Sequence, residues 1–364
     1  MSKRIIIAGG GTGGHIFPAI AIANAIKSKA PETKILFVGA EDRMEMEKVP
    51  QAGYEIKGLT IAGFNRSSLI KNISLPFKLI KSFMQVKKIF RDFPPDVVIG
   101  VGGYSSFPVL RMAQQKGIPS FIHESNSFAG KSNMMVGKKA TRIFVATEGM
   151  EKFFPQEKIM ITGNPVRKNI SGNRIHRDEA IRFFGLNADK KTVLVTGGSL
   201  GAKGINEAID KGVDELTKND IQLIWQTGKP FADRAAHHAA ENRNVWINSF
   251  ISEMEYAYAA ADIVVSRAGA MAIAELCIAK KPLILVPFPF AAEDHQTVNA
   301  MYLEKRNACV MVKDQEAGEK LIPEILKLVK DEARQEEMRR NVGMLAVDDA
   351  DEKIADAILE YLND

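Results

Sequence analysis

The first residues that could do chemistry form a glycine-rich turn followed at once by a histidine. The stretch RIIIAGGGTGGH runs from Arg4 to His15 and has glycine at five of the six positions from Gly9 to Gly14. Backbone amides without Cβ atoms, backed by the start of a helix, favour an anionic oxygen. An imidazole with an ordinary pKa of about 6.5 can accept a proton near neutral pH. The stretch therefore predicts a phosphate-binding turn with a base, His15, beside it.

The same glycines, Gly9-x-Gly11-x-x-Gly14, also match the fingerprint of dinucleotide-binding domains. That fingerprint requires an acidic residue about 20 positions further on, at the end of the second strand, to bind the ribose. Here Glu41 and Asp42 come about 30 residues after the glycines. The displaced acids disfavour an NAD-dependent oxidoreductase, which stays open as an alternative.

Two more glycine turns follow apolar runs elsewhere in the chain. They are IGVGGYSS, residues 99–106, and TGGSLGA, residues 196–202. Three such turns in one chain predict more than one bound phosphate, or a diphosphate shared between two substrates. By its position and its likeness to the first turn, the turn at Gly102-Gly103 is a candidate contact for a diphosphate.

Short β-branched runs alternate with longer helical patterns along the chain. After the opening run these are KILFVG, DVVIGVGG, SFIHES, RIFVAT, KIMITGNP, TVLVTGG, IQLIWQTG, VWINSF, ADIVVSRAG and PLILVPFP. Continuous apolar strands with helices between them predict parallel sheets covered on both faces, the α/β class. Because the strand and glycine-turn pattern restarts at Thr192, we expect two Rossmann-like halves joined near residues 162–169. The stretch DDADEKIADAILEYL predicts a closing amphipathic helix.

Composition sets the class of protein. The chain has 364 residues, 46% of them hydrophobic and 26% charged, which is typical of a globular protein with two domains. We expect no signal peptide and no transmembrane segment, because no apolar run approaches about 18 residues. Cys277 and Cys309 lie in apolar runs, which predicts buried thiols in a reducing cytosol and no disulfide.

An ordered set of motifs resembles the bacterial N-acetylglucosaminyltransferases that complete the peptidoglycan precursor lipid II. The motifs, in order, are GGGTGGHIFPA, GGYSSFP, HESNSFAG, GNPVR, GGSLGA, SRAGAMAIAE and PFPFAAEDHQTVNA. The resemblance runs from residue 4 to about residue 300. It implies a GT-B fold, in which two Rossmann-like domains with parallel sheets face each other across a cleft. The N-terminal domain would span residues 1–164 and be completed by a C-terminal helix, 347–364. The C-terminal, donor-binding domain would span 165–346.

The resemblance also implies an activity and its substrates. The enzyme would transfer GlcNAc from UDP-GlcNAc to the muramoyl 4-hydroxyl of undecaprenyl-diphospho-muramoylpentapeptide (lipid I), with inversion. It would work as a peripheral protein on the cytoplasmic face of the cell membrane, and its contacts with other cell-wall synthesis proteins stay open. A UDP-GlcNAc 2-epimerase of the same fold is the alternative, and a non-catalytic UDP-sugar-binding protein is disfavoured.

The motifs assign binding roles to individual residues. Glu275 would bind the ribose, the backbone of Ile251 the uracil, and Gln296 the sugar hydroxyls. Arg167 and Ser199 would meet the diphosphate or the sugar, and Asn126 the donor sugar. The first amides of one helix, at Ala270 and Met271, would bind phosphate, and the turn Thr12-Gly13-Gly14 would contact the donor sugar. Leu200 stands where the family usually has Gln, so any contact through that amide is in doubt.

His15 is the predicted base for the acceptor hydroxyl, with His123 and Glu124 as competing candidates. The leaving diphosphate can be neutralised by helix N-termini and Arg167, so we expect no catalytic metal and no cofactor. The one Asp-x-Asp pattern near the sites, Asp349-Ala350-Asp351, is expected to be solvated surface.

One segment makes the protein basic. Residues 66–91 contain seven Lys and Arg residues and no acid, and without them the chain would carry a net negative charge. Bulky apolar residues alternate with these cations, which favours an anionic membrane surface as partner. Nucleic acid is disfavoured because no binding motif is present.

Overall fold

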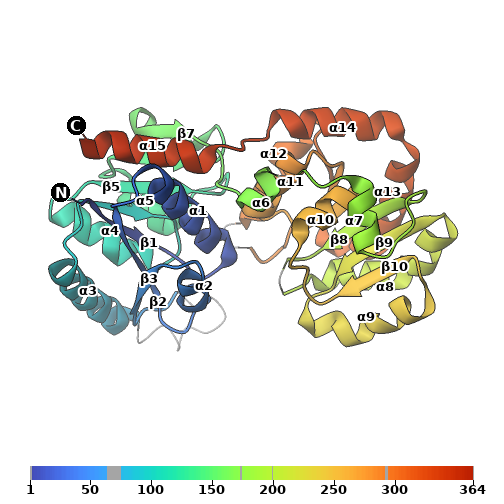
Figure 1. The fold of residues 1–364 in the computed structure, drawn as a ribbon, viewed down its shortest axis with the longest axis horizontal. Coiled ribbons are helices and arrows are strands. Elements are labelled where there is room, and N and C mark those ends of the chain that lie inside the picture. The colour runs from blue at the N-terminus through green and yellow to red at the C-terminus, as the bar shows by residue number, and fades with distance from the viewer. Residues whose placement is uncertain (1, 64–74, 173, 199, 292–293, 364) are drawn as a thin grey trace. The chain divides into compact units, whose positions relative to one another are not determined.

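The computed structural model describes residues 2–63, 75–172, 174–198, 200–291 and 294–363. The chain forms two compact units, Met1–Val166 with Asp349–Asp364 and Arg167–Asp348 (Figure 1). The divisions predicted from the sequence lie two residues earlier in the chain.

Unit 1 is built on a seven-stranded parallel sheet with strand order β3-β2-β1-β4-β5-β6-β7. Its strands are β1 Arg4–Ala8, β2 Lys34–Ala40, β3 Glu55–Leu59, β4 Val97–Gly100, β5 Ser120–Glu124, β6 Arg142–Val145 and β7 Ile159–Ile161. Its helices are α1 Gly13–Lys29, α2 Glu45–Gln51, α3 Leu75–Asp92, α4 Ser106–Gln115, α5 Lys131–Gly137 and α15 Ala350–Asn363, with 3-10 turns at Met150–Lys152 and Gln156–Lys158.

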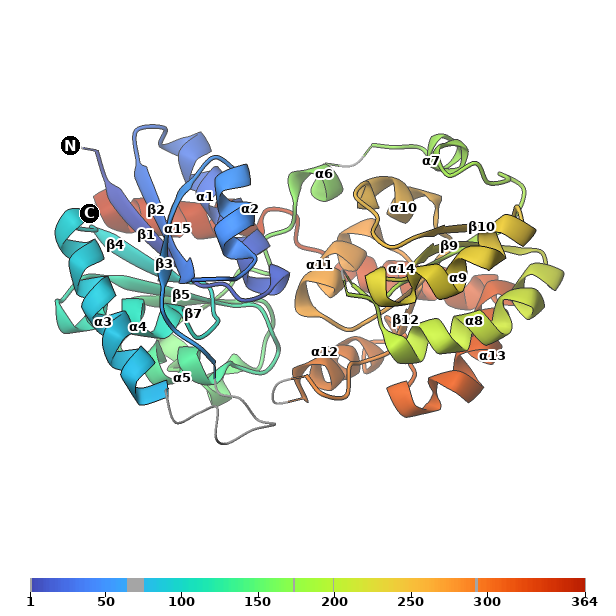
Figure 2. The same cartoon turned by 90° about the horizontal axis from the view of Figure 1, so that it is seen from below.

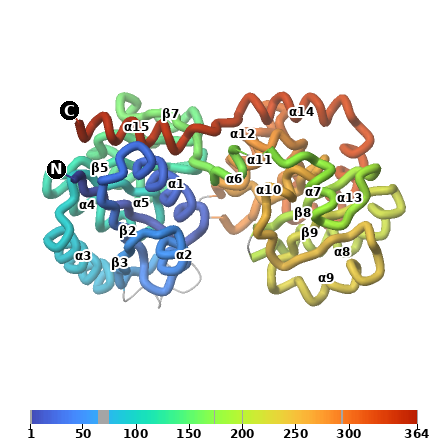
Figure 3. Tube along the Cα trace, in the orientation of Figure 1, coloured from blue at the N-terminus to red at the C-terminus, as the bar shows by residue number. Residues whose placement is uncertain are grey.

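Alternate residues of these strands pack on opposite faces of the sheet. Ile5 and Ile7 of β1 face α1 and α15, whereas Ile6 and Ala8 face α3, α4 and α5. Helices α3 and α4 lie side by side on their face (Figure 2). The C-terminal helix α15 lies beside α1, and its Ile354 and Ile358 are fully buried there (Figure 3). The end of the chain therefore completes the core of the unit that contains its beginning.

Unit 2 has a six-stranded parallel sheet with strand order β10-β9-β8-β11-β12-β13. Its strands are β8 Lys191–Thr196, β9 Ile221–Gln226, β10 Val245–Asn248, β11 Ile263–Ser266, β12 Leu283–Leu285 and β13 Val310–Met311. Its helices are α6 Lys168–Ser171, α7 Arg177–Phe183, α8 Lys203–Lys218, α9 Lys229–Glu241, α10 Met254–Ala260, α11 Ala270–Ala279, α12 His295–Glu304, α13 Ala317–Lys330 and α14 Glu332–Met344, with a 3-10 turn at Asp314–Glu316. Both sheets have the parallel, doubly covered arrangement that the apolar runs predict.

Two strands were not indicated by the sequence, and both lie at sheet edges. β3 (EIKGL) mixes charged residues with glycine because one side of an edge strand meets solvent, and β13 has only two residues. Such strands lack the continuous apolar run by which the buried strands are recognised.

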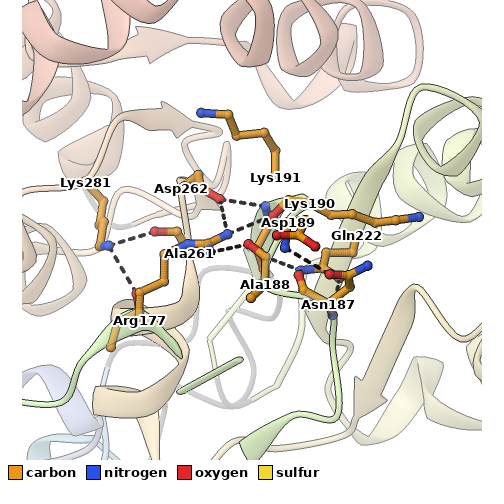
Figure 4. A network of polar contacts seen from close by, with 12 residues as sticks. Arg177, Asn187, Ala188, Asp189, Lys190, Lys191, Gln222, Ala261, Asp262 and Lys281 are labelled. Atoms are coloured by element: carbon orange, nitrogen blue, oxygen red, sulfur yellow. Dashed lines mark hydrogen bonds and ion pairs between the residues drawn. The ribbon is translucent and has the colours of Figure 1, made fainter. Parts of the chain in front are cut away.

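A polar network ties α7 to the amino ends of the unit 2 strands, opposite the glycine turns (Figure 4). Arg177 donates to the carbonyl oxygens of Ala188 and Lys190 at 2.8 and 2.7 Å and pairs with Asp262 at 3.1 Å. Lys281 donates to the Ala261 carbonyl at 2.7 Å, and its burial lowers the pKa of its ammonium group to about 8. The network fixes strand starts and lies away from the predicted site residues.

Three further predictions from the sequence concern the two cysteines, Asp351 and membrane-spanning helices. Cys277 and Cys309 are free and buried as expected, and burial raises the pKa of each thiol to about 12. Asp351 was expected in solvent but is 5% exposed, because it lies in the first turn of α15 on the side that packs into unit 1. No helix in the described ranges is long and apolar enough to cross a membrane.

Candidate active site

The first two glycine turns of unit 1 pack directly against each other. A Cβ atom on Gly9 would lie 2.7 Å from the Gly102 carbonyl oxygen, and one on Gly103 would lie 2.4 Å from the Gly10 carbonyl oxygen. Gly103 also has a φ of +82°, which L side chains rarely adopt. At these positions the protein's own backbone fills the space that a side chain would occupy, so the glycines are needed whether or not a ligand binds.

A buried carboxylate that the sequence analysis missed holds the first turn. Glu45, at the start of α2, is 1% exposed, and its Oε2 accepts from the Gly11 amide at 2.8 Å. Its Oε1 accepts from the Ala40 amide at the end of β2 at 2.9 Å. The neighbouring amides of Gly9 and Gly10 donate to the carbonyl oxygens of Val38 and Gly102. The first amides of α1, at Gly13 and Gly14, are the ones that a helix start offers to an outside acceptor such as an anion.

His15 stands on the first turn of α1, half-buried, next to the second glycine turn. Its Nδ1 lies 3.1 Å from the Gly10 carbonyl oxygen and 3.4 Å from Thr12 Oγ1. Because a carbonyl only accepts, we assign the proton to Nδ1 and the basic lone pair to Nε2. Nε2 would lie 2.8 Å from a Cβ atom on Gly102, so a side chain at Gly102 would displace the imidazole.

The two competing candidates for the base are both buried in β5. His123 is fully buried, and burial lowers the pKa of its imidazole to about 4. Glu124 is 3% exposed and accepts from the Gly130 amide and Asn133 Nδ2, both at 2.9 Å. Its other oxygen accepts from the amide and Nδ2 of Asn126, at 3.1 and 3.3 Å. Glu124 therefore orients Asn126, and the geometry favours His15 as the base that an acceptor can reach.

In unit 2 the glycine turn after β8 is fixed by Gln226, a second residue that the sequence analysis missed. Gln226 is 3% exposed, and its Nε2 donates to the Gly198 carbonyl at 2.9 Å. Its Oε1 accepts from the Ile251 amide at 2.9 Å, so the turn and the Ile251 loop are joined through one side chain. Ser199 lies outside the described residues, and Leu200 is 83% exposed.

Helix α11 begins directly after Gly269, so the amides of Ala270 and Met271 lie at its positive end, as predicted. Glu275, 9% exposed, follows on the same helix. Arg167 donates from Nε to Glu275 Oε1 at 3.0 Å, and its Nη2 forms an ion pair with the same oxygen at 2.9 Å. The structure thus joins two predicted site residues that lie far apart in sequence. Burial raises the pKa of Glu275, and the Arg167 guanidinium opposes that shift.

Gln296 lies on α12, in the stretch that the motifs assign to the sugar. Its Oε1 accepts from the Phe288 amide at 3.0 Å, which anchors the loop after β12 and orients the Nε2 group.

Comparison with known proteins identifies the family. Residues 5–145 match the N-terminal domain of glycosyltransferase family 28, and residues 192–357 match its C-terminal domain. The chain belongs to glycosyltransferase family 28. The predictions of a GT-B fold and of a glycosyltransferase are confirmed.

Curated relatives of this family 28 glycosyltransferase match it over nearly its whole length. A Parabacteroides distasonis protein is 51% identical over 99% of this chain and 98% of its own, and one from Cytophaga hutchinsonii is 48% identical over 99% and 97%. Both are named UDP-N-acetylglucosamine–N-acetylmuramyl-(pentapeptide) pyrophosphoryl-undecaprenol N-acetylglucosamine transferase.

Solved structures support the fold of this family 28 glycosyltransferase. The crystal structure of Acinetobacter baumannii MurG matches with a TM-score of 0.79 and 26% identity, over 98% of this chain and 99% of that one. A UDP-N-acetylglucosamine 2-epimerase matches with a TM-score of 0.68 over 100% and 97% of the two chains. At 14% identity the epimerase likeness shows the fold alone, so the family assignment favours glycosyl transfer over both alternatives.

Proposed function

We propose that this enzyme transfers GlcNAc from UDP-GlcNAc to the muramoyl 4-hydroxyl of lipid I and forms lipid II. The observation that carries the proposal is the match, at about half identity over nearly the whole chain, to relatives named for that transfer. The anion-binding helix starts and the imidazole described above are what such a transfer requires.

Unit 2 would bind the donor. The α11 amides of Ala270 and Met271 face the diphosphate, and Glu275 accepts from the ribose hydroxyls. The Ile251 amide is occupied by Gln226, so the uracil would be recognised by the Ile251 carbonyl oxygen. Gln296 would donate to the sugar hydroxyls from its Nε2 group. Ser199 would contact the diphosphate or the sugar.

Unit 1 would activate the acceptor. His15 Nε2 takes the proton of the 4-hydroxyl as its oxygen attacks the anomeric carbon from the face opposite UDP, which inverts that carbon. Asn126 and the Thr12-Gly13-Gly14 turn would contact the donor sugar. The Gly102-Gly103 turn is our candidate contact for the diphosphate of lipid I.

The leaving UDP would be stabilised without a metal. Main-chain amides at the α11 start and the Arg167 guanidinium can meet the developing charge. In the described ranges, one group of His and acidic side chains, Asp210 with His237 and His238, has a spacing that could hold a cation. It lies along α8 and the last turns of α9, and Arg234 already pairs with the Asp210 carboxylate at 2.7 Å.

We also propose attachment to the cytoplasmic membrane face through α3. Phe77, Ile80 and Met84 lie on one face of this helix and are 73%, 60% and 65% exposed. The described cations of the basic segment on the same helix are Lys78, Lys81, Lys87, Lys88 and Arg91, and residues 66–74 lie outside the described ranges. Each cation near an anionic surface contributes about 1 kcal/mol, and inserted apolar groups add to it.

One assay tests the transfer. Radiolabelled UDP-GlcNAc is incubated with a short-chain lipid I analogue, with and without EDTA. We expect labelled lipid II in both reactions. UDP-ManNAc formed without acceptor would identify an epimerase instead, and loss of product in EDTA would refute the metal-free mechanism.

A flotation assay with anionic liposomes at low salt tests attachment. Phe77→Ser with Met84→Ser should reduce binding while leaving UDP affinity unchanged, since α3 belongs to unit 1. Wild-type protein that fails to bind the liposomes would refute the attachment.

A further inference from the structure

A buried tyrosine lies behind the carboxylate of Glu275. Tyr258, on α10, is 4% exposed, and its hydroxyl donates to Glu275 Oε2 at 3.0 Å. Burial and the nearby carboxylate raise the pKa of this phenol well above its ordinary value, so it stays a donor at every physiological pH. Glu275 is therefore held on its buried side by Tyr258 and on its other side by the half-exposed Arg167.

The Glu275 carboxylate has too few lone-pair positions to accept from Tyr258, Arg167 and both ribose hydroxyls at once. A carboxylate offers about four lone-pair positions. Arg167 donates to Oε1 from Nε and its Nη2 pairs with the same oxygen, whereas Tyr258 donates to Oε2. The guanidinium therefore covers Oε1, and about one lone-pair position, on Oε2, is left for a ligand. A ribose diol has two hydroxyl donors, so Glu275 can accept both only if one present partner withdraws. Arg167 is the partner that can withdraw, because a donor's diphosphate offers its guanidinium another anion.

We propose that Tyr258 is a positioning residue. It keeps the Glu275 carboxylate oriented while the contacts from Arg167 to that carboxylate are replaced by hydrogen bonds from the ribose hydroxyls. The inference rests on the proposed function, in which Glu275 binds the ribose of UDP-GlcNAc. Tyr258 touches neither the sugar nor the nucleotide. Its bond fixes the rotation of the carboxylate and so aims the remaining lone pairs toward the ribose. Recognition of ribose over deoxyribose would therefore depend on a hydroxyl group buried behind the site.

The same helix supplies a matched control. Tyr256, two residues earlier on α10, also donates its hydroxyl to a carboxylate, that of Glu179 on α7, at 3.3 Å. Tyr256→Phe and Tyr258→Phe thus remove the same atom and the same kind of bond from one helix, and only the second touches Glu275.

The test is calorimetric binding of UDP, 2′-deoxy-UDP and 3′-deoxy-UDP to the wild-type protein and both variants. Each ribose hydroxyl bound to a charged acceptor should give wild type a preference of about tenfold or more for UDP over the matching deoxy analogue. In Tyr258→Phe we expect at least one of these ratios to fall by about threefold or more, because a bond to a misaligned acceptor is weaker. Tyr256→Phe should keep the wild-type ratios. Because a ratio of two dissociation constants does not depend on the folded fraction, partial misfolding of a variant cannot imitate the result.

Other outcomes separate the inference from the function on which it rests. If Tyr258→Phe binds UDP and both deoxy analogues more weakly by one common factor, or keeps or enlarges the wild-type ratios, Tyr258 is no positioning residue. If the wild-type protein does not bind UDP, the proposed donor is wrong. If it binds UDP and both deoxy analogues equally, Glu275 does not bind the ribose, and the inference falls with that assignment.

Discussion

The burial of His123 predicts that unit 1 loses stability in mild acid. Neither ring nitrogen has a partner with hydrogen-bonding geometry among the described residues, although the backbone of Gly163 and the side chain of Asn164 lie near enough to raise the pKa slightly. Burial outweighs them and lowers the pKa of the imidazole to about 4. The folded protein therefore keeps His123 neutral at pH values where the unfolded chain protonates it.

The size of the effect follows from the two pKa values. The unfolded imidazole titrates at about 6.5 and the folded one at about 4, so the free energy of unfolding falls as pH drops through this window. Between pH 7.5 and pH 5 the linkage relation gives a loss of about 2 kcal/mol from this one group. Replacing His123 with Leu, which is apolar and does not titrate, should remove that loss.

The assay must report on unit 1. Both tryptophans, Trp225 and Trp246, belong to unit 2, so their fluorescence does not follow the unfolding of β5. Hydrogen exchange in increasing urea, resolved to peptides covering β4 and β5, measures the free energy of unfolding at each pH. On going from pH 7.5 to pH 5, the free energy of unfolding of wild type should fall by about 2 kcal/mol more than that of His123→Leu. The control His176→Leu, at an exposed position, should follow wild type.

Two results would refute this reasoning. One is an equal loss of stability in wild type and His123→Leu between pH 7.5 and pH 5. The other is an NMR titration of labelled imidazoles in which His123 protonates near pH 6.5 in the folded protein.

Three further predictions concern single side chains. His15→Ala should lower kcat by about two to three orders of magnitude in a turnover assay. Its affinity for UDP, measured by calorimetry, should stay within a factor of about two of wild type. Near-normal turnover would show that His15 is not the base. Glu45→Gln leaves one acceptor oxygen for the two amides of Gly11 and Ala40, so it should destabilise unit 1 by about 1–3 kcal/mol in the exchange assay and raise the KM for the acceptor. An equal loss of UDP affinity would contradict a role confined to unit 1. Lys281 has a lowered pKa, so the folded state loses its proton near pH 8 while the unfolded chain keeps it until about pH 10.5. Between pH 7.5 and pH 9.5 the free energy of unfolding of wild type should therefore rise by about 2 kcal/mol relative to that of Lys281→Met. Urea unfolding followed by tryptophan fluorescence measures this difference. Parallel pH curves would show that this lysine is solvated.

The fold class follows from local patterns alone. Each buried strand is a continuous apolar run, and each restart of the pattern is marked by a glycine turn, so two parallel sheets could be predicted without knowing how strands pair. The edge strands β3 and β13 could not, because an edge strand needs no apolar run. His123 shows a related limit: in a strand buried on both faces, alternation does not tell which polar residue meets solvent.

The sequence by itself determined the two-sheet α/β fold, the helix starts that offer amides to phosphate, and the place of an imidazole, His15, at the first glycine turn. Only the tertiary structure decided which side chains hold these groups in place. Glu45 meets Gly11 across 34 positions of sequence, and Arg167 meets Glu275 across 108. The physical reason is that periodicity fixes the face on which a residue lies, whereas its partner depends on which elements the sheet order makes neighbours.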